Sequence, residues 1–68
     1  MIQIDKQAIG LRLKKLRGER SQAEVADALK VTPMAISQYE RGERIPNDVM
    51  KLKIAEYYGV SVSDIFFA

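Results

Sequence analysis

The sequence contains no cysteine, no histidine and no tryptophan among its 68 residues. Without cysteine the chain forms no disulfide bond, and without cysteine or histidine it lacks the usual zinc ligands and two common nucleophiles. We therefore expect no metal and no cofactor. No apolar run approaches the ~20 residues that a membrane-spanning helix needs. Residues 1–5 lack the basic and apolar regions of a signal peptide, so we expect a cytoplasmic protein without membrane association.

The net charge of the sequence is also small. The formal net charge is +2 and the isoelectric point is about 9.1, which permits nucleic-acid binding but does not by itself predict it. Hydrophobic residues make up 47% of the sequence, which is too much for a disordered tail. The length predicts a single domain over residues 1–68. Because a chain this short buries only about 60% of its unfolded surface, dimerisation would stabilise it.

Signals for helix starts and helix ends recur along the chain. Side-chain oxygens suit N-cap positions at Asp5, Ser21, Thr32, Asn47 and Ser61. Three helix ends have a glycine that can take the left-handed conformation, at Gly18, Gly42 and Gly59, whereas the fourth end, near Lys30, has none. These signals predict helices near residues 6–17, 22–29, 33–41, 48–58 and 62–67. Each helix carries one apolar stripe and no strand signal competes, so we expect an all-α fold of five helices around one core.

The segment from Gln22 to Arg41 has the form of a helix-turn-helix, because a break of about three residues separates its two predicted helices. On a wheel of about 100° per residue, Ile36 and Tyr39 lie on one side of the second of these helices. The opposite side carries short polar, thioether and guanidinium groups from Met34, Ser37, Gln38 and Arg41. An ordinary solvated helix more often shows Glu and Lys on that side. The pattern therefore indicates a face that enters the major groove of DNA.

Each outward group suits a particular contact with DNA. Gln38 can pair with adenine through two hydrogen bonds, which discriminates by about 1–3 kcal/mol, and Met34 and Ala35 can contact a thymine methyl group. Ser37 can pair with several bases or with a phosphate. The free N–H groups at the start of the first helix of the motif suit a phosphate, together with the Gln22 amide.

Two arginines flank Gly42 after the motif's second helix. A phosphate beside Arg41 and Arg44 would accept charge-assisted hydrogen bonds, and Lys30 in the turn is a weaker candidate. The alternative for each residue taken alone is structural. Arg41 and Arg44 would then be solvated surface charges, and Thr32, like the other predicted caps, would serve only its helix. Only the combined pattern favours DNA binding.

The ordered motifs resemble the Cro and phage-repressor type of helix-turn-helix, the XRE-like family. They are IGLRLKKLR (9–17), SQAEVA (21–26), VTPMAISQYERG (31–42), Pro46, KIA (53–55) and YGVS (58–61), and the resemblance covers about residues 8 to 67. Any one piece is weak evidence, whereas the ordered set is specific. The resemblance implies a five-helix domain that binds double-stranded DNA, usually as a two-fold dimer that regulates transcription.

The resemblance also assigns roles by position. It implies base reading by Pro33, Met34, Ser37 and Gln38, and phosphate binding by Gln22, Thr32, Arg41 and Arg44. Arg17 and Glu40 resemble a buried ion pair between the first and third helices. The alternative is an exposed pair worth about 0–1 kcal/mol.

The sequence departs from the family pattern at three places. The connection at residues 18–20 is short and has Arg20 where an apolar residue commonly precedes Ser21. Lys30 stands where the turn usually has glycine, and a left-handed backbone at a residue other than glycine costs about 1–2 kcal/mol. Pro33 and Met34 are poor hydrogen-bond donors, so specificity would depend on Gln38, on thymine methyl groups and on DNA shape.

The C-terminal segment carries more apolar surface than one short helix buries. We expect Tyr57, Phe66 and Phe67 to form a two-fold homodimer interface, which sets the recognition helices about 34 Å apart for a palindromic operator. The alternative is that Phe67 folds back on its own core.

Three classes of function follow from these features. The first is a sequence-specific transcription regulator, a repressor that blocks polymerase or an activator that contacts it. The second is a protein-interaction module such as an antitoxin, in which the same aromatic residues contact another protein. The third, an enzyme, is disfavoured because the scattered acids form no paired site and so small a chain hardly builds a pocket, so we also expect no small-molecule ligand.

Overall fold

The computed structural model of the protein describes residues 5–67, and this part of the chain contains five helices and no strand. The helices are α1 (Lys6–Arg17), α2 (Gln22–Leu29), α3 (Pro33–Glu40), α4 (Asp48–Tyr58) and α5 (Val62–Phe66). The all-α, five-helix prediction is confirmed, and every helix begins and ends within one residue of the predicted bounds. None of the helices in residues 5–67 is long and apolar enough to cross a membrane.

Local side-chain hydrogen bonds explain why the helices begin where they do. The Ser21 hydroxyl accepts from the Glu24 N–H at 3.0 Å, and the Thr32 hydroxyl accepts from the Ala35 N–H at 3.2 Å. The same kind of bond forms at all five predicted N-caps, the other three being Asp5, Asn47 and Ser61. Each bond satisfies an N–H group that has no partner within its helix. The predicted helix starts are therefore confirmed.

The helix ends agree with the prediction at most positions. Gly59 is left-handed, with φ 71° and ψ 32°, and Gly42 also has a positive φ of 72°. Gly18 is different: its φ is 59° but its ψ is −127°, which lies outside the left-handed region predicted for it. Lys30 does adopt the left-handed conformation, with φ 62° and ψ 42°. The turn between α2 and α3 thus keeps the geometry usually given by glycine, at some cost in backbone strain.

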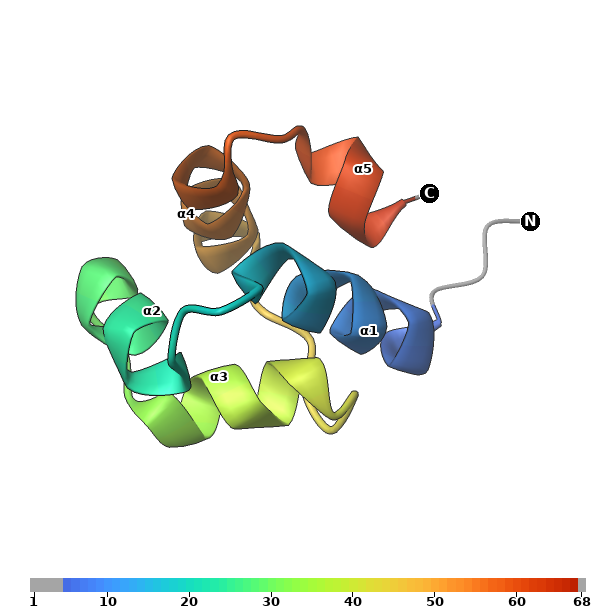
Figure 1. Cartoon of the computed structure of the whole chain (residues 1–68). Coiled ribbons are helices and arrows are strands. Elements are labelled where there is room, and N and C mark those ends of the chain that lie inside the picture. Colours follow the sequence, from blue (N-terminus) through green and yellow to red (C-terminus); the bar gives the residue numbers. More distant parts are fainter. Residues whose placement is uncertain (1–4, 68) are drawn as a thin grey trace.

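The helices pack with α1 in the middle of the bundle (Figure 1). On one side of α1 lies α3, which also packs against α2, and on the other side lies α5, which packs against α4. The core is formed by apolar residues from all five helices, among which Val25, Ile54 and Ile65 are completely buried. Because α4 and α5 lie away from α3, one long side of α3 remains uncovered by other helices.

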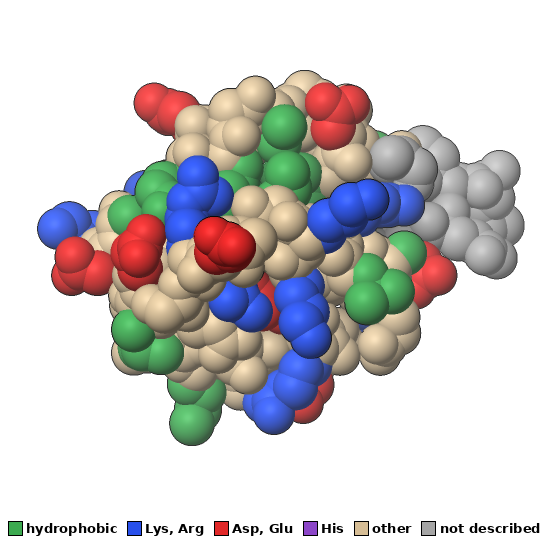
Figure 2. Space-filling model, in the orientation of Figure 1, with side chains coloured by type: hydrophobic (Ala, Val, Ile, Leu, Met, Phe, Trp, Pro, Cys, Tyr) green, Lys and Arg blue, Asp and Glu red, His purple; other side chains and the backbone are tan. Residues whose placement is uncertain are grey.

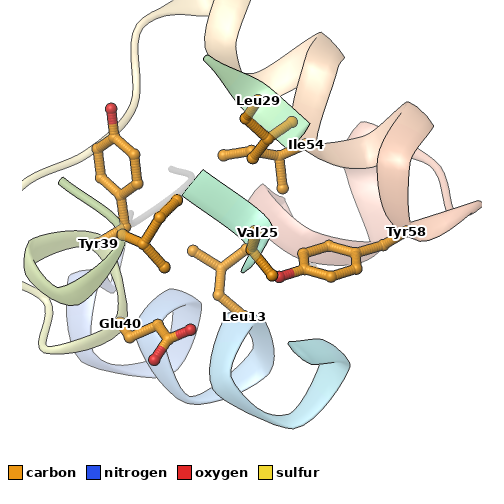
Figure 3. A pocket seen from close by; sticks show the side chains of 8 residues that line it. Leu13, Val25, Leu29, Tyr39, Glu40, Ile54 and Tyr58 are labelled. Atoms are coloured by element: carbon orange, nitrogen blue, oxygen red, sulfur yellow. The ribbon is translucent and has the colours of Figure 1, made fainter. Parts of the chain in front are cut away.

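The centre of the core contains a pocket of about 10 Å³, which is close to the volume needed for one water molecule. Figure 3 shows the aliphatic side chains around it, together with Tyr39, Tyr58 and the carboxylate of Glu40. A space of this size holds no substrate.

A close approach of backbones joins α1 to α3. Gly10 in the middle of α1 is buried, and a Cβ atom placed on it would lie 2.8 Å from the carbonyl carbon of Glu40 and closer still to the carbonyl oxygen. A second close approach involves Gly42, where a Cβ atom would lie 3.0 Å from the side chain of Gln7. The end of α3 and the loop after it are therefore held tightly against the first half of α1.

Candidate nucleic-acid interface

The outward side of α3 is open to solvent, as the helical wheel predicts. Met34 is 68% exposed, Pro33 is also exposed, and Ser37 and Gln38 are half-buried. On the inward side, Ile36 and Tyr39 are each 4% exposed, in agreement with their predicted place in the core. The four side chains expected to read bases therefore share the solvent side of one helix.

Ala35 lies on the inward side instead. It is 8% exposed and belongs to the core, so the expectation that it contacts a thymine methyl together with Met34 is wrong for this conformation. The reason is that Ala35 precedes Ile36 and is four residues before Tyr39, which places it at the edge of the buried stripe. Met34 is the remaining apolar side chain for such a contact.

A buried carboxylate connects α3 to both other helices of this region. Glu40 accepts hydrogen bonds from Arg17 Nε at 2.7 Å and from Arg17 Nη2 at 3.1 Å, and its side chain is 4% exposed. The buried ion pair implied by the resemblance is therefore present, and the alternative of an exposed pair is excluded. The hydrogen bond to Glu40 raises the pKa of Arg17, because the charged guanidinium is the donor.

Gln22 takes part in the same network. Its amide nitrogen donates to Oε1 of Glu40 at 3.0 Å, and the side chain is half-buried at the start of α2. An amide nitrogen has two N–H groups, so one can donate to a phosphate while the other donates to Glu40. The network thus holds the Gln22 side chain in a fixed position beside the start of α2, where the backbone N–H groups favour an anion.

Thr32 has a structural role that the sequence also allowed. Its hydroxyl oxygen caps α3 by accepting from Ala35 N–H, and the residue is exposed. A hydroxyl that accepts one bond still has a proton to donate, so capping and a phosphate contact are compatible at this side chain.

The two arginines after α3 differ in their surroundings. Arg41 forms an ion pair with Glu43, with Nε 3.1 Å from Oε2, and both side chains are more than half exposed. Arg44 lies with its guanidinium carbon 5.6 Å from the centre of the Tyr39 ring. In Figure 2 basic side chains form a column that runs from α1 towards the end of α3, while a hydrophobic side chain projects near the start of α3. The candidate interface thus has an apolar side chain near the start of α3 and basic side chains near its end.

The expected dimer residues are only partly available at the surface. Phe67 is 49% exposed and Tyr57 is half-buried. Phe66 is 3% exposed and belongs to the core, so it cannot contact a second copy in this conformation, and we remove it from the expected interface. Because α5 is short, Phe66 next to Ile65 completes its buried stripe, and Phe67, directly after the helix, is the exposed one of the two phenylalanines.

Arg20 explains how the short α1–α2 connection is accommodated. Its guanidinium carbon lies 5.5 Å from the centre of the Tyr57 ring and 5.7 Å from that of Tyr58. Its Nη1 donates to the carbonyl of Leu16 at 3.3 Å. Arg20 therefore packs on α4 in place of the apolar residue usual in the family.

Sequence reasoning missed several features of this surface. It found neither the pairing of Arg41 with Glu43 nor the close approach at Gly10, although a glycine inside a predicted helix is a signal for close packing. It also gave no reason to expect the exposed apolar side chains Leu11, Val49 and Leu52. The two exposed residues on α4 lie outside its buried stripe, whose core members are Met50, Ile54 and Ala55.

The fold and this surface define an all-α protein of the helix-turn-helix class. Residues 13–65 match the sequence model of the family described as helix-turn-helix. The chain belongs to the Cro-like, or XRE-like, helix-turn-helix family of DNA-binding transcriptional regulators. A search of curated protein sequences found no match.

Solved structures agree with this assignment. The P22 c2 repressor in complex with synthetic operator 9T is 30% identical with a TM-score of 0.83, over 87% of this chain and 92% of that one. The restriction-modification controller protein C.AhdI from Aeromonas hydrophila is 28% identical with a TM-score of 0.82, over 91% of this chain and 97% of that one. The hydroxypropylphosphonic acid epoxidase from S. wedmorenis is 23% identical with a TM-score of 0.78, over 90% of this chain but 34% of that one, and shares only the fold.

Proposed function

We propose that this regulator is a homodimeric repressor that binds a palindromic operator and prevents polymerase from occupying the same DNA. The observation that supports it is the uncovered side of α3, where Met34, Ser37 and Gln38 stand outside the core. A helix with such a side fits the major groove, and Gln22, Thr32, Arg41 and Arg44 lie where they can contact the phosphates that border it. The repressor of known structure bound to an operator has the same fold.

Homodimerisation is part of the proposal. Tyr57 on α4 and Phe67 directly after α5 offer apolar surface, and a two-fold contact through these elements would leave both α3 helices free, because α4 and α5 lie away from α3. Two recognition helices about 34 Å apart would read two half-sites on one face of the duplex. A palindromic operator follows from that symmetry.

Selection of bound sequences from random duplex DNA tests the function. The purified protein is expected to enrich one sequence with two inverted half-sites, and the selected duplex should be bound more tightly than a scrambled one at the same salt concentration. Enrichment of a single half-site would contradict the dimer alone. No enrichment at all would contradict sequence-specific binding.

A protein-interaction module is the second candidate function. It is favoured by the exposed apolar side chains Leu11, Val49, Leu52 and Phe67, because an exposed apolar side chain gains free energy when a partner covers it. Loss of DNA binding in salt-controlled gel shifts, together with a defined protein partner, would favour the second candidate.

A further inference from the structure

The ion pair between Arg41 and Glu43 lies directly in the proposed phosphate-binding region. Two contacts join the side chains, from Nε of Arg41 to Oε2 of Glu43 at 3.1 Å and from Nη2 to Oε1 at 3.3 Å. The Arg41 side chain is 60% exposed and that of Glu43 is 51% exposed. The carboxylate thus occupies two donors that a DNA phosphate would use, and both groups remain accessible to solvent.

Backbone hydrogen bonds fix this pair to the end of the recognition helix. The N–H of Arg41 donates to the Ser37 carbonyl at 2.9 Å, and the N–H of Glu43 donates to the Gln38 carbonyl at 2.9 Å. Gly42 between them has a φ of 72°, which turns the chain back towards α3. The backbone of both ion-pair residues is therefore bonded to Ser37 and Gln38, two of the residues proposed to read bases.

The neighbouring arginine provides a contrast. Arg44 lies over the Tyr39 ring, an uncharged partner that leaves its positive charge uncancelled. Arg41 and Glu43 together carry no net charge, so at a distance they attract a duplex no more than a neutral dipole does. Of the two arginines assigned to phosphates, only Arg44 then contributes fully to the long-range attraction.

This difference affects non-specific and specific binding unequally. Non-specific binding depends on net charge and on the release of counterions, so a cancelled charge contributes little to it. In a seated complex a phosphate oxygen lies against the guanidinium, and Arg41 can exchange its exposed carboxylate partner for that phosphate at small cost. The released carboxylate is exposed enough to be hydrated.

We propose that Glu43 is a specificity-determining residue, which neutralises Arg41 towards non-cognate DNA and releases it to a phosphate when α3 is seated on its operator. The inference rests on the proposed DNA-binding function. In this proposal an acidic residue within a basic region increases the discrimination between DNA sequences.

The test compares Glu43→Gln, Arg41→Gln and the double variant with the parent protein. The control is Glu56→Gln, which removes an exposed negative charge from α4. Binding is measured at about 0.1 M salt and over a salt series, on the duplex selected from random DNA and on a scrambled duplex of equal length and composition.

The expected result is a loss of discrimination. Glu43→Gln should tighten binding to the scrambled duplex about fivefold to tenfold and steepen its salt slope by about one, as one additional phosphate contact would. Binding to the selected duplex should tighten about threefold or less, because only the exposed ion pair is removed there. In the Arg41→Gln background, Glu43→Gln should change the ratio of the two affinities no more than the Glu56→Gln control does.

Other results overturn the inference in distinguishable ways. Equal tightening on both duplexes, or an effect no larger than that of Glu56→Gln, means that Glu43 adds only general charge. A change in the ratio of the two affinities that persists with Arg41→Gln means that the carboxylate affects discrimination without the arginine. A changed preference at one base pair means that Glu43 reads a base. If the parent binds neither duplex, the proposed function fails together with the inference.

Discussion

Glu40 shows how one side chain can organise this surface. Its carboxylate accepts bonds from Arg17 on α1 and from Gln22 on α2, while its own backbone ends α3. Because the cost of desolvating buried charges offsets much of their attraction, such a pair contributes less to stability than its short distances suggest. It does fix the three helices relative to one another and holds Gln22 at the proposed interface.

The division between base-reading and phosphate-binding residues gives the first prediction. Gln38→Ala should reduce the preference at one base-pair position by about 1–3 kcal/mol, because an amide that pairs with a base is removed. Arg44→Ala should weaken binding to all sequences and lower the salt slope by about one. Competition binding with single-base variants of the selected duplex, repeated over a salt series, measures both effects. If the two variants behave alike, the assigned roles are wrong.

The half-buried tyrosine Tyr58 gives a prediction about pH. Burial, with a smaller contribution from the charge of Glu40, raises the pKa of Tyr58 to about 12, above the ordinary value of about 10. The folded state therefore holds this proton more tightly than the unfolded state does. The resulting stability is complete below about pH 10 and is lost as the pH rises towards about 12.

Urea unfolding at pH values of about 8, 10 and 11 measures this loss. Tyr58→Phe removes the titrating group, so the free energy of unfolding of the variant should fall less steeply than that of the parent between the two higher values. Between the two lower pH values, the free energy of unfolding should change with pH equally in the variant and in the parent. A variant that loses stability as steeply as the parent would show that other groups cause the alkaline transition.

At the scale of elements, α1 and α3 are held together at Gly10. The backbone of α3 near Glu40 occupies the position that a Cβ atom would take, so the two helices approach as closely as a glycine permits. The contact places the recognition helix at a fixed distance from the centre of the bundle. It also explains a glycine in the interior of a helix, where this residue costs about 1 kcal/mol relative to alanine.

Gly10→Ala should therefore destabilise the protein although it improves helix propensity. The overlap with the Glu40 carbonyl is expected to cost about 1–3 kcal/mol more than the propensity gain returns, as overpacked sites usually do. The midpoint of urea unfolding measures the change. Lys14→Ala, an exposed substitution in the same helix, should stay within about 0.5 kcal/mol of the parent. A Gly10→Ala variant as stable as the parent would exclude the close approach.

The helices themselves were predictable because their signals are local. Ser21 and Thr32 bond to N–H groups three residues away, and the apolar stripe of α3 separates Ile36 and Tyr39 from Gln38 within two turns. The base-reading face followed from the same periodicity and remains a prediction as a site.

The contacts that join distant segments were not predictable in this way. The position of Arg20 over Tyr57, the contact of Gly10 with α3 and the burial of Phe66 depend on which helices meet in the folded chain. The hydrophobic periodicity of one helix does not indicate which other helices it contacts. The Arg17–Glu40 pair was anticipated only because the family resemblance supplied it.

On the scale of the whole molecule, the two ends of the bundle have different surfaces. Helices α4 and α5 lie away from α3 (Figure 1), with Tyr57 on α4 and Phe67 directly after α5. A Lys51 ammonium lies 5.5 Å from the Phe67 ring, so this aromatic side chain is partly supported by its own chain and is still 49% exposed. The arrangement permits a second copy at one end and DNA at the other.

Sedimentation at micromolar concentration should show a homodimer for the parent protein. Phe67→Ser should shift the equilibrium towards monomer, because it removes apolar area worth about 1.5–3 kcal/mol per buried aromatic side chain. Met34→Ser, an exposed apolar substitution on α3, is the matched control and should leave the mass unchanged. A parent that remains monomeric with and without DNA would contradict the proposed interface.

Different residues of α3 pack in the core and face outward, and this difference determines how the DNA specificity of the protein can be changed. The residues that fasten the helix to its neighbours are Ala35, Ile36, Tyr39 and Glu40, whereas Met34, Ser37 and Gln38 contribute little to the core. New side chains at these three outward positions would meet solvent or a duplex rather than the interior. Substitutions at these three positions can therefore change the operator that the protein binds without changing the core residues that determine its fold.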